Sequence, residues 1–423
     1  MNKRHIRWMI LLGLLSLLAA QFVARTELRA YFSVDYWQSV SRYGKVMRIV
    51  ESQFVHADQV NFKALTDIAL REAVRSLDSH SDYMTVDEYH QFEMASKQEY
   101  VGVGIEVGQF SGRVVLTQVF EQGVAAASGM LAGDFIVGVD TADTRTETLG
   151  DVVRRIRGEP GTIVNIEVER PMTTETLTFE LERRAIALDS VIDVEMKTDN
   201  VGYLRVRQFI GETRNEMLAA MATLQRQGMA ALVIDLRGNP GGRLDTAVAM
   251  AEVFLQEGQK ILTVQSRRGV EEVLFARTSD AGFDGPMAIL IDRHSASASE
   301  ILAGALRDHR RAVLVGENSF GKGSVQSVYG FRGGDGLKLT SARYLLPGGE
   351  AINGTGVAPN LLVERTDEEA ILLMLQKHHL RRITPDTFGE VFGFRPVEDS
   401  QVRAAVELLD ALGALRFALM NDE

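Results

Sequence analysis

The sequence of 423 residues contains no cysteine. This excludes disulfide cross-links, thiolate catalysis and lipid attachment through a cysteine near the N-terminus. Positive charge is also scarce, because 57 Asp and Glu residues outnumber 46 Lys and Arg residues and give a net charge of −11. An acidic chain repels phosphate backbones, so we expect no nucleic acid among its partners. The overall composition, 45% hydrophobic and 24% charged, is typical of a globular protein with two or three domains.

The N-terminus combines a basic segment with an apolar one. Residues 3–7 carry three basic side chains, and residues 8–24 carry no charge. This pattern predicts an export signal or a membrane anchor in residues 1–25. The body would then lie outside the cytoplasm, in the periplasm or cell envelope, either secreted or anchored to the inner membrane by residues 8–24. No clean Ala-x-Ala site follows, so cleavage and retention both stay open.

The rest of the chain changes character three times. Apolar residues at helical spacing predict an N-terminal helical region over residues 26–97. Alternating strands and helices over residues 184–365 predict an α/β core with a mixed or parallel sheet. Residues 366–423 are predicted to be mostly helical, and they could pack on the core or serve as an oligomerisation arm.

Residues 98–183 resemble a PDZ domain. A glycine-interrupted strand at 100–107 is followed by a Gly-Asp-Phe-Ile turn at 133–136 and a helix at 148–157. A PDZ domain binds the C-terminus of a peptide as an added strand, and loop amides hold the terminal carboxylate. The residues expected to bind that carboxylate are Gly102, Val103, Gly104 and Ile105.

Two motifs invite other interpretations. Residues 316–323 follow a strand and look like a phosphate-binding loop, but Gly323 stands where that motif needs Ser or Thr to hold Mg²⁺. Asp78, His80 and Ser81 offer the residue types of a catalytic triad. Such residues adjacent in sequence rarely face one another, and this composition is typical of a turn.

The most informative stretch is Ser-Ala-Ser-Ala-Ser at 295–299, between the apolar strand 287–291 and a helical pattern at 299–309. Small residues beside a helix N-terminus allow a hydroxyl to stand where backbone N–H groups converge. Taken alone, the stretch is better explained as an ordinary serine cap of the helix. There is no Gly-x-Ser-x-Gly elbow in the chain.

A serine nucleophile needs a base. His294 is too close in sequence to Ser297 for good geometry, and His309 reads as a helix end. Lys322, which follows Ser297 by one helix and one strand, is the better candidate, because a buried lysine can be neutral and accept a proton. Gln326 could hold its amine through the amide oxygen.

Several blocks together resemble the carboxy-terminal processing peptidases, also called tail-specific proteases. The three signature blocks are residues 235–242, 295–300 and 321–326. Three further blocks resemble the same family, and the likeness extends over residues 40–365; they are residues 77–81, 339–349 and 354–360.

The resemblance implies a role for each matching residue. Ser297 matches the nucleophile, Lys322 the general base, and Gln326 the residue that orients this base. The remaining matches are the oxyanion-hole amides of Ala298, Gly241 and Gly242, with Gly242 preferred to Gly241, and two supporting acids, Glu300 and Asp308.

The resemblance also implies a fold and a reaction. The fold is a crotonase/ClpP-like α/β spiral protease core, residues 184–365, with the PDZ domain inserted before it. The expected activity is that of an exported serine endopeptidase that needs no cofactor or metal and acts on proteins with free C-terminal tails. An adaptor lipoprotein would be a further partner. Oligomeric state stays open, with 35–60 and 366–423 as the segments where a homo-oligomer would form.

Two other functions compete with this one. A catalytically silent PDZ scaffold at the cell envelope would need neither nucleophile nor base, and the intact set of Ser297, Lys322 and Gln326 argues against it. An acyltransferase or hydratase on a crotonase-like core would need a coenzyme A site, which the sequence does not show. Departures from the family pattern at 292–294 and at Asn360 do not touch the predicted catalytic residues.

Overall fold

The central sheet of the protein is built from strands that alternate with helices. The computed structural model describes residues 33–96, 100–110, 112–170, 176–186, 189–277, 283–379, 384–392 and 394–421. The central sheet has the order β10 (Val191–Met196), β11 (Val201–Val206), β12 (Ala231–Asp235), β15 (Met287–Ile291), β16 (Val313–Gly316) and β19 (Leu361–Leu362). From β11 to β19 all neighbours are parallel, and β10 is antiparallel to β11. The mixed sheet predicted for this region is therefore present.

Both faces of the central sheet are covered by helices. Successive residues of a strand point to opposite faces, so Leu232 and Ile234 face one core cluster while Val233 faces the other. The first cluster is closed by α7 (Thr213–Arg226), α8 (Leu244–Glu252) and α9 (Ala298–Asp308). The second is closed by α12 (Ser400–Asn421), which contributes Ala405 and Leu409.

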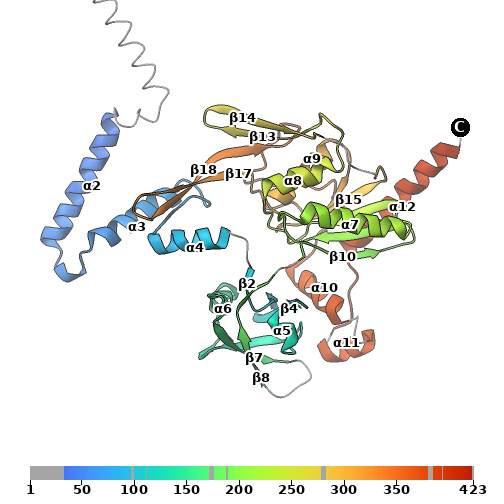
Figure 1. The fold of residues 1–423 in the computed structure, drawn as a ribbon, viewed down its shortest axis with the longest axis horizontal. Coiled ribbons are helices and arrows are strands. Elements are labelled where there is room, and N and C mark those ends of the chain that lie inside the picture. The colour runs from blue at the N-terminus through green and yellow to red at the C-terminus, as the bar shows by residue number, and fades with distance from the viewer. Residues whose placement is uncertain are drawn as a thin grey trace, which may run out of the picture.

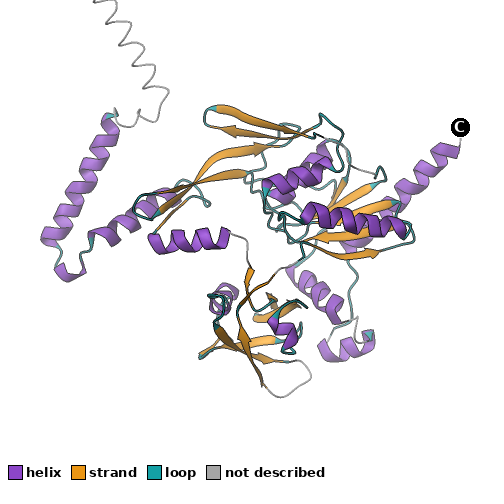
Figure 2. Ribbon diagram, in the orientation of Figure 1, coloured by secondary structure: helices purple, strands orange, loops and turns teal. Residues whose placement is uncertain are grey.

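A second, mostly antiparallel sheet lies beside this core (Figure 2). It contains β1 (Asp82–Met84), β13 (Lys260–Ser266), β14 (Gly269–Phe275), β17 (Ser324–Gly330) and β18 (Gly336–Leu345). The long strand β18 pairs with β17, β13 and β1, so this sheet joins segments from both ends of the chain.

The PDZ-like unit forms a separate sheet with its own core, coloured teal in Figure 1. The order is β3 (Ile105–Phe110), β4 (Arg113–Val119), β5 (Phe135–Val139), β7 (Ile163–Glu169) and β8 (Thr176–Glu182), and β6 (Ala142–Asp143) pairs with β5. Its helices are α5 (Val124–Ala127) and α6 (Leu149–Ile156). The unit is entered through β2 (Tyr100–Gly102) and left through β9 (Arg184–Ile186), and these two strands pair with each other.

The N-terminal helices lie at one end of the molecule, with α2 projecting away from the sheets (Figure 1). They are α2 (Val34–Gln53), α3 (Phe62–Arg75) and α4 (Val86–Ser96), with a single 3-10 turn, η2 (Ala57–Gln59), between α2 and α3. The apolar residues that predicted these helices do not form a core, because α2 and α3 have no buried residue. Residues 1–25, where a signal or anchor is predicted, lie outside the described residues. Within the described ranges no helix combines the length and apolarity needed to cross a membrane.

The C-terminal region packs on two different units. Helix α10 (Asp367–His379) contacts β3 and β4 of the PDZ-like unit, where Ile371 lies near Gly108. A short helix, α11 (Pro385–Phe392), follows, and the first half of α12 then covers the central sheet. For these described residues, the structure favours packing on the body over a free arm.

Candidate active site

Three loops meet at one edge of the central sheet. They leave β12, β15 and β16, which are adjacent and parallel, at their carboxyl ends. The loop after β12 carries Gly241 and Gly242, the loop after β15 carries Ser297, and the loop after β16 carries Lys322. Because the carboxyl ends of parallel strands share one edge, residues far apart in the sequence are brought together here.

Ser297 is the residue at which the chain turns from the β15 loop into α9. Its backbone has φ 56° and ψ −111°, a conformation that residues other than glycine rarely adopt. Such a conformation costs about 1–3 kcal/mol and occurs mainly at functional sites. Ser297 is half-buried, whereas its neighbours Ala296 and Ala298 are buried.

The other two serines of the stretch have structural roles. Ser295 donates its hydroxyl to the backbone oxygen of Leu236 at 2.9 Å, and Ser299 donates to the backbone oxygen of Asn239 at 3.0 Å. Both side chains are fully buried. Only Ser297 of the three is therefore partly open to solvent, as expected if it alone reacts.

Glu300 joins the nucleophile turn to the loop that bears Lys322. Its Oε2 atom accepts hydrogen bonds from the backbone N–H of Ser297 at 2.7 Å and of Lys322 at 2.9 Å. Its Oε1 atom accepts from the backbone N–H of Gly321 at 2.7 Å and from the Ser319 hydroxyl at 2.6 Å. The carboxylate is fully buried. One oxygen atom thus fixes the backbone of Ser297 beside that of Lys322.

The loop of Lys322 is not a phosphate-binding loop. Strand β17 starts at Ser324, where that motif requires a helix. The backbone N–H of Phe320 donates to the Ser295 oxygen at 3.0 Å, which adds a second link between the two loops.

Within the described residues the side chains of Ser297 and Lys322 make no hydrogen bond with each other. Catalytic hydrogen bonds are often long before substrate binds, so the geometry is compatible with a serine–lysine pair.

Gln326 lies on β17 directly after a bulge. The register between β17 and β18 shifts between Val325 and Gln326, and Gln326 then faces Thr340. The Gln326 amide nitrogen donates to the Ser324 hydroxyl at 2.8 Å and, at a longer 3.5 Å, to the Thr340 hydroxyl. Bulges next to active sites commonly redirect one side chain. The described structure contains no hydrogen bond between Gln326 and Lys322.

The loop of Gly241 and Gly242 lies against Ser297. A Cβ atom on Gly241, whose φ is +101°, would lie 2.6 Å from the Ala296 oxygen and 2.9 Å from the Ser297 Cβ, so only glycine fits. The Gly241 N–H is already bound by the Asn239 side chain at 2.8 Å. In the part of the chain that is described, the N–H groups of Gly242 and Ala298 have no acceptor. These two amides are therefore free to donate to a bound group.

Asp308 lies far from this chemistry. It is the last residue of α9, so it stands about 15 Å along the helix from Ser297. Its Oδ2 accepts from the Gly348 N–H at 2.8 Å, which ties the closing segment of the core to the helix end. The His309 ring contacts the Lys260 oxygen at 2.7 Å, in agreement with its assignment to a helix end.

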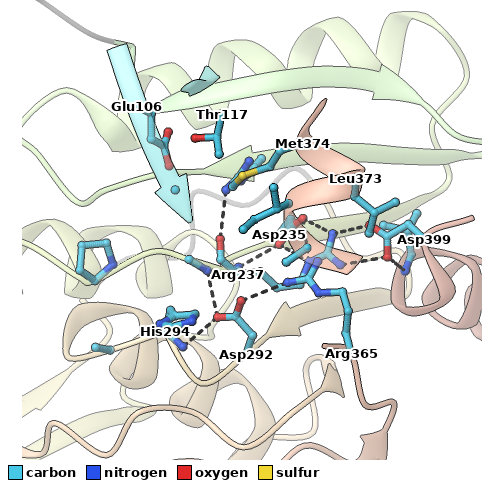
Figure 3. A pocket seen from close by; sticks show the side chains of 18 of the residues that line it. Glu106, Thr117, Asp235, Arg237, Asp292, His294, Arg365, Leu373, Met374 and Asp399 are labelled. Carbon is cyan, nitrogen blue, oxygen red and sulfur yellow. Dashed lines mark hydrogen bonds and ion pairs between the residues drawn. The ribbon is translucent and has the colours of Figure 1, made fainter. Parts of the chain in front are cut away.

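A buried ion network supports the loop after β12. Arg237 lies between the carboxylates of Asp235 and Asp399, at 2.6 and 2.9 Å, and Tyr203 donates to Asp235 at 2.6 Å (Figure 3). Burial by itself raises the pKa of Asp235, but the charges of Arg237 and Arg205 and the hydrogen bonds from Arg237 and Tyr203 together outweigh it and hold that pKa well below its usual range. The pKa of Asp399 is lowered in a similar way, since the charge and hydrogen bonds of Arg237 and the N–H of Val402 together outweigh its burial.

The site opens into a cavity of about 1240 Å³. Figure 3 shows labelled residues of the core, the PDZ-like unit and α10 around this space, with Asp292 facing Arg365. Lys322 and Ala296 line it from the core, Val107 from β3, and Met374 from α10. The cavity therefore connects the lysine loop with the edge of the PDZ-like sheet.

The predicted carboxylate-binding residues lie at the start of this edge strand. Gly104 has φ +85°, and a Cβ on it would lie 2.5 Å from the Gly123 Cα, so glycine is required for backbone packing. Gly102 meets open space instead. The oxygens of Val103 and Gly104 accept from Ala125 and Phe120. Among the described strands β3, which begins at Ile105, pairs only with β4, and so its outer edge is open.

One structural residue of the site was missed by sequence reasoning. The side chain of the fully buried Asn239 donates to the Val206 oxygen and accepts from the Gly241 N–H. The backbone oxygen of Asn239 accepts from the Ala296 N–H and from the Ser299 hydroxyl. It thereby joins the glycine loop to the nucleophile turn. The available signal was a polar residue inside a glycine-rich segment directly after a buried strand.

Comparison with known proteins shows which families the chain resembles. The model of peptidase family S41 matches residues 200–363, and that of the PDZ domain matches residues 115–170. A carboxy-terminal-processing protease of Bartonella bacilliformis is 34% identical over 78% of this chain and 76% of its own. The carboxy-terminal processing protease CtpB of Bacillus subtilis is 30% identical over 78% of this chain and 69% of its own.

A solved structure has a similar fold. The photosystem II D1 C-terminal processing protease is 27% identical, covers 76% of this chain and 92% of its own, and superposes with a TM-score of 0.50. The residues matched by the peptidase family model include the loops that carry Gly241, Ser297 and Lys322. The chain therefore belongs to peptidase family S41, among the PDZ-containing carboxy-terminal processing serine proteases.

Proposed function

We propose that this protein is an exported endopeptidase that cleaves polypeptides near their free C-termini, with Ser297 as nucleophile and Lys322 as general base. The observation that carries the assignment is the buried Glu300 carboxylate, whose Oε2 binds the backbone N–H of both residues. The strained backbone of Ser297 supports the same choice, because strain of this kind is concentrated at reacting residues.

The chemistry follows from the positions of the groups. A neutral Lys322 amine accepts the proton of the Ser297 hydroxyl, and the oxygen attacks the scissile carbonyl carbon. The negative charge on the carbonyl oxygen is taken up by the N–H groups of Ala298 and Gly242. Lys322 then gives the proton to the leaving amine, and water hydrolyses the acyl-enzyme. Gln326 orients the lysine, and Glu300 and Asp308 support the loops.

The PDZ-like unit binds the C-terminal tail of the substrate and presents it to the core. A C-terminal peptide adds to the open edge of β3, opposite α6, and its carboxylate is held by the amides at Gly102, Val103, Gly104 and Ile105. The cavity that Val107 and Lys322 both line gives the peptide a route from this edge to the loop of Lys322. The strand order and the covering helices support a crotonase/ClpP-like spiral for the protease core.

Residues 1–25 would direct the protein to the periplasm or cell envelope, where the basic segment and the apolar run 8–24 act as signal or anchor. An adaptor lipoprotein and a homo-oligomer belong to the same proposal. The domain boundaries that go with it are 1–25, 26–97, 98–183, 184–365 and 366–423.

Cleavage of an unfolded protein with a free C-terminal tail tests the activity. Mass spectrometry of the products should show cuts near the C-terminus with the unmodified protein, and a loss of at least about 10³-fold in rate for Ser297→Ala. Lys322→Arg should be equally inactive, because arginine does not deprotonate. Ser341→Ala, on β18, is the matched serine control and should remain active.

Two results would contradict the assignment. An active Ser297→Ala variant would rule out this nucleophile. Tail binding without cleavage by the unmodified protein would instead indicate a PDZ scaffold. Competition with peptides that differ only in a free or an amidated C-terminus tests tail capture, since only the free carboxylate should compete.

A further inference from the structure

The segment that precedes β1 contacts the strand opposite Gln326. Asp78 lies in the turn before β1, and its Oδ1 accepts from the Thr340 hydroxyl of β18 at 3.2 Å. The buried Ser81 hydroxyl donates to Asp78 Oδ2 at 2.8 Å and accepts from the Thr340 N–H at 3.0 Å. Thr340 in turn is the register partner of Gln326. The turn that looked like an isolated triad is thus connected to the residue expected to orient the base.

The donor and the acceptor of each hydrogen bond between Asp78 and Gln326 can be assigned. An ionised carboxylate only accepts hydrogen bonds, so the Thr340 hydroxyl must give its single proton to Asp78. The Thr340 oxygen can then only accept from Gln326, so the amide nitrogen is the end of Gln326 that faces it, at 3.5 Å, while the Ser81 hydroxyl lies 3.4 Å from the same oxygen. The 2.8 Å bond to Ser324 holds the same end of the amide. The carbonyl oxygen of Gln326 is left as the end that can accept from an amine.

Asp78 keeps its charge under ordinary conditions. Partial burial raises its pKa, but the hydrogen bonds from the Ser81 hydroxyl, from the amides of His80 and Ser81 and from Thr340 outweigh it, and the pKa lies below its usual value. The two amide bonds measure 2.7 and 2.9 Å. The acceptor at the start of the chain of hydrogen bonds is therefore fixed both in place and in charge.

We propose that Asp78 and Thr340 are positioning residues that fix the amide of Gln326 with its nitrogen toward Thr340 and its carbonyl oxygen toward Lys322. The inference rests on the proposed roles of Lys322 and Gln326. It also gives the N-terminal region a part in catalysis, because α3 is joined to β1 through the paired side chains of Arg75 and Asp82.

The test compares two hydroxyl deletions on β18. Thr340→Val removes the hydroxyl that faces Gln326 and should lower kcat about 10-fold, with little change in KM, since one hydrogen bond of this kind is lost. Thr340→Ser keeps the hydroxyl and should restore kcat. Ser341→Ala removes the neighbouring hydroxyl, which binds Ser327 at 2.6 Å, and should leave kcat unchanged. Thermal unfolding confirms that all variants are folded.

A double-mutant cycle separates positioning from general damage. If Thr340 acts through Gln326, adding Thr340→Val to Gln326→Ala should cause no further loss of kcat. Equal losses in both backgrounds, a rise in kcat for Thr340→Val alone, or equal effects of the Thr340 and Ser341 deletions would each overturn the proposal. An unmodified protein that fails to cleave, or a Ser297→Ala variant that still cleaves, would instead overturn the proposed function.

Discussion

The catalytic loops and the N-terminal helices are held by very different means. Around Ser297, buried polar groups bind one another across three loops, and Glu300 alone accepts four hydrogen bonds. Along α2, by contrast, no side chain is buried, although the helix has 20 residues. Helices in proteins usually take most of their stability from tertiary packing. The free energy of folding must therefore be concentrated in the core, and changes of similar size should have very different effects in the two regions.

The largest difference should appear at the buried ion network. Arg237→Ala leaves the carboxylates of Asp235 and Asp399 without their cation and should lower the free energy of unfolding by about 3–5 kcal/mol. Urea denaturation measures the loss. The control is Arg403→Ala, which breaks an exposed pair with Glu398 and should cost less than about 1 kcal/mol. Similar losses at both sites would erase the distinction between core and surface.

A smaller loss of stability with a specific effect on activity is expected at Glu300. Glu300→Gln replaces one acceptor oxygen with an NH2 group that faces N–H donors. The free energy of unfolding should fall by about 2 kcal/mol as a result. Because the altered contacts position Ser297 and Lys322, kcat should fall as well. Glu216→Gln is the matched control, since Glu216 also accepts several bonds, from Ser190 and Val191, but outside the site. It should lose stability and keep kcat.

A fall in pH should destabilise the core, because the pKa values of two buried carboxylates are lowered in the folded protein. The pKa of Asp235 lies below the usual 3.8, because the charges and hydrogen bonds of its neighbours, Arg237 first among them, together outweigh the effect of burial, and that of Asp399 is lowered likewise. The stability that they contribute is complete well above the unfolded-state pKa of 3.8 and is lost as the pH falls toward the folded-state values. The urea midpoint should drop between pH 5 and about pH 2. Asp399→Asn should flatten this dependence; an unchanged slope would show that other groups dominate.

The smallest effects are expected on the N-terminal helices. Ile49 and Ile68 are each 60% exposed, so Ile49→Ala and Ile68→Ala should change the free energy of unfolding by no more than about 0.5 kcal/mol. Urea denaturation of the dilute protein measures both. A loss of several kcal/mol at either position would mean that these side chains are covered in solution.

The same contrast explains which features the sequence could predict. Residues 231–234 and 287–291 are continuous apolar runs because both faces of their strands are buried, and the loops after these strands carry serine, lysine or glycine residues. The serine, lysine and glycine loops were recognisable for this reason. Their roles in catalysis are still predictions.

Contacts between distant segments were not predictable. Nothing near Arg237 indicates that its second carboxylate is Asp399, 162 residues away. The pairing of β1 with β18 and the packing of α10 on the PDZ-like sheet also depend on surfaces that exist only in the folded chain. The apolar spacing in α2 predicted a helix correctly, but such a pattern does not say whether the apolar face will be covered by the same chain.

The pairing of β2 with β9 has a consequence for how such proteins can be rebuilt. Tyr100 lies opposite Ile186, so the chain leaves the PDZ-like unit beside the point where it entered. Modules with neighbouring ends can be inserted, exchanged or excised with little disturbance of the host fold. A chimaera joined at these two strands would receive a different tail-recognition module while the order of the catalytic strands stayed the same.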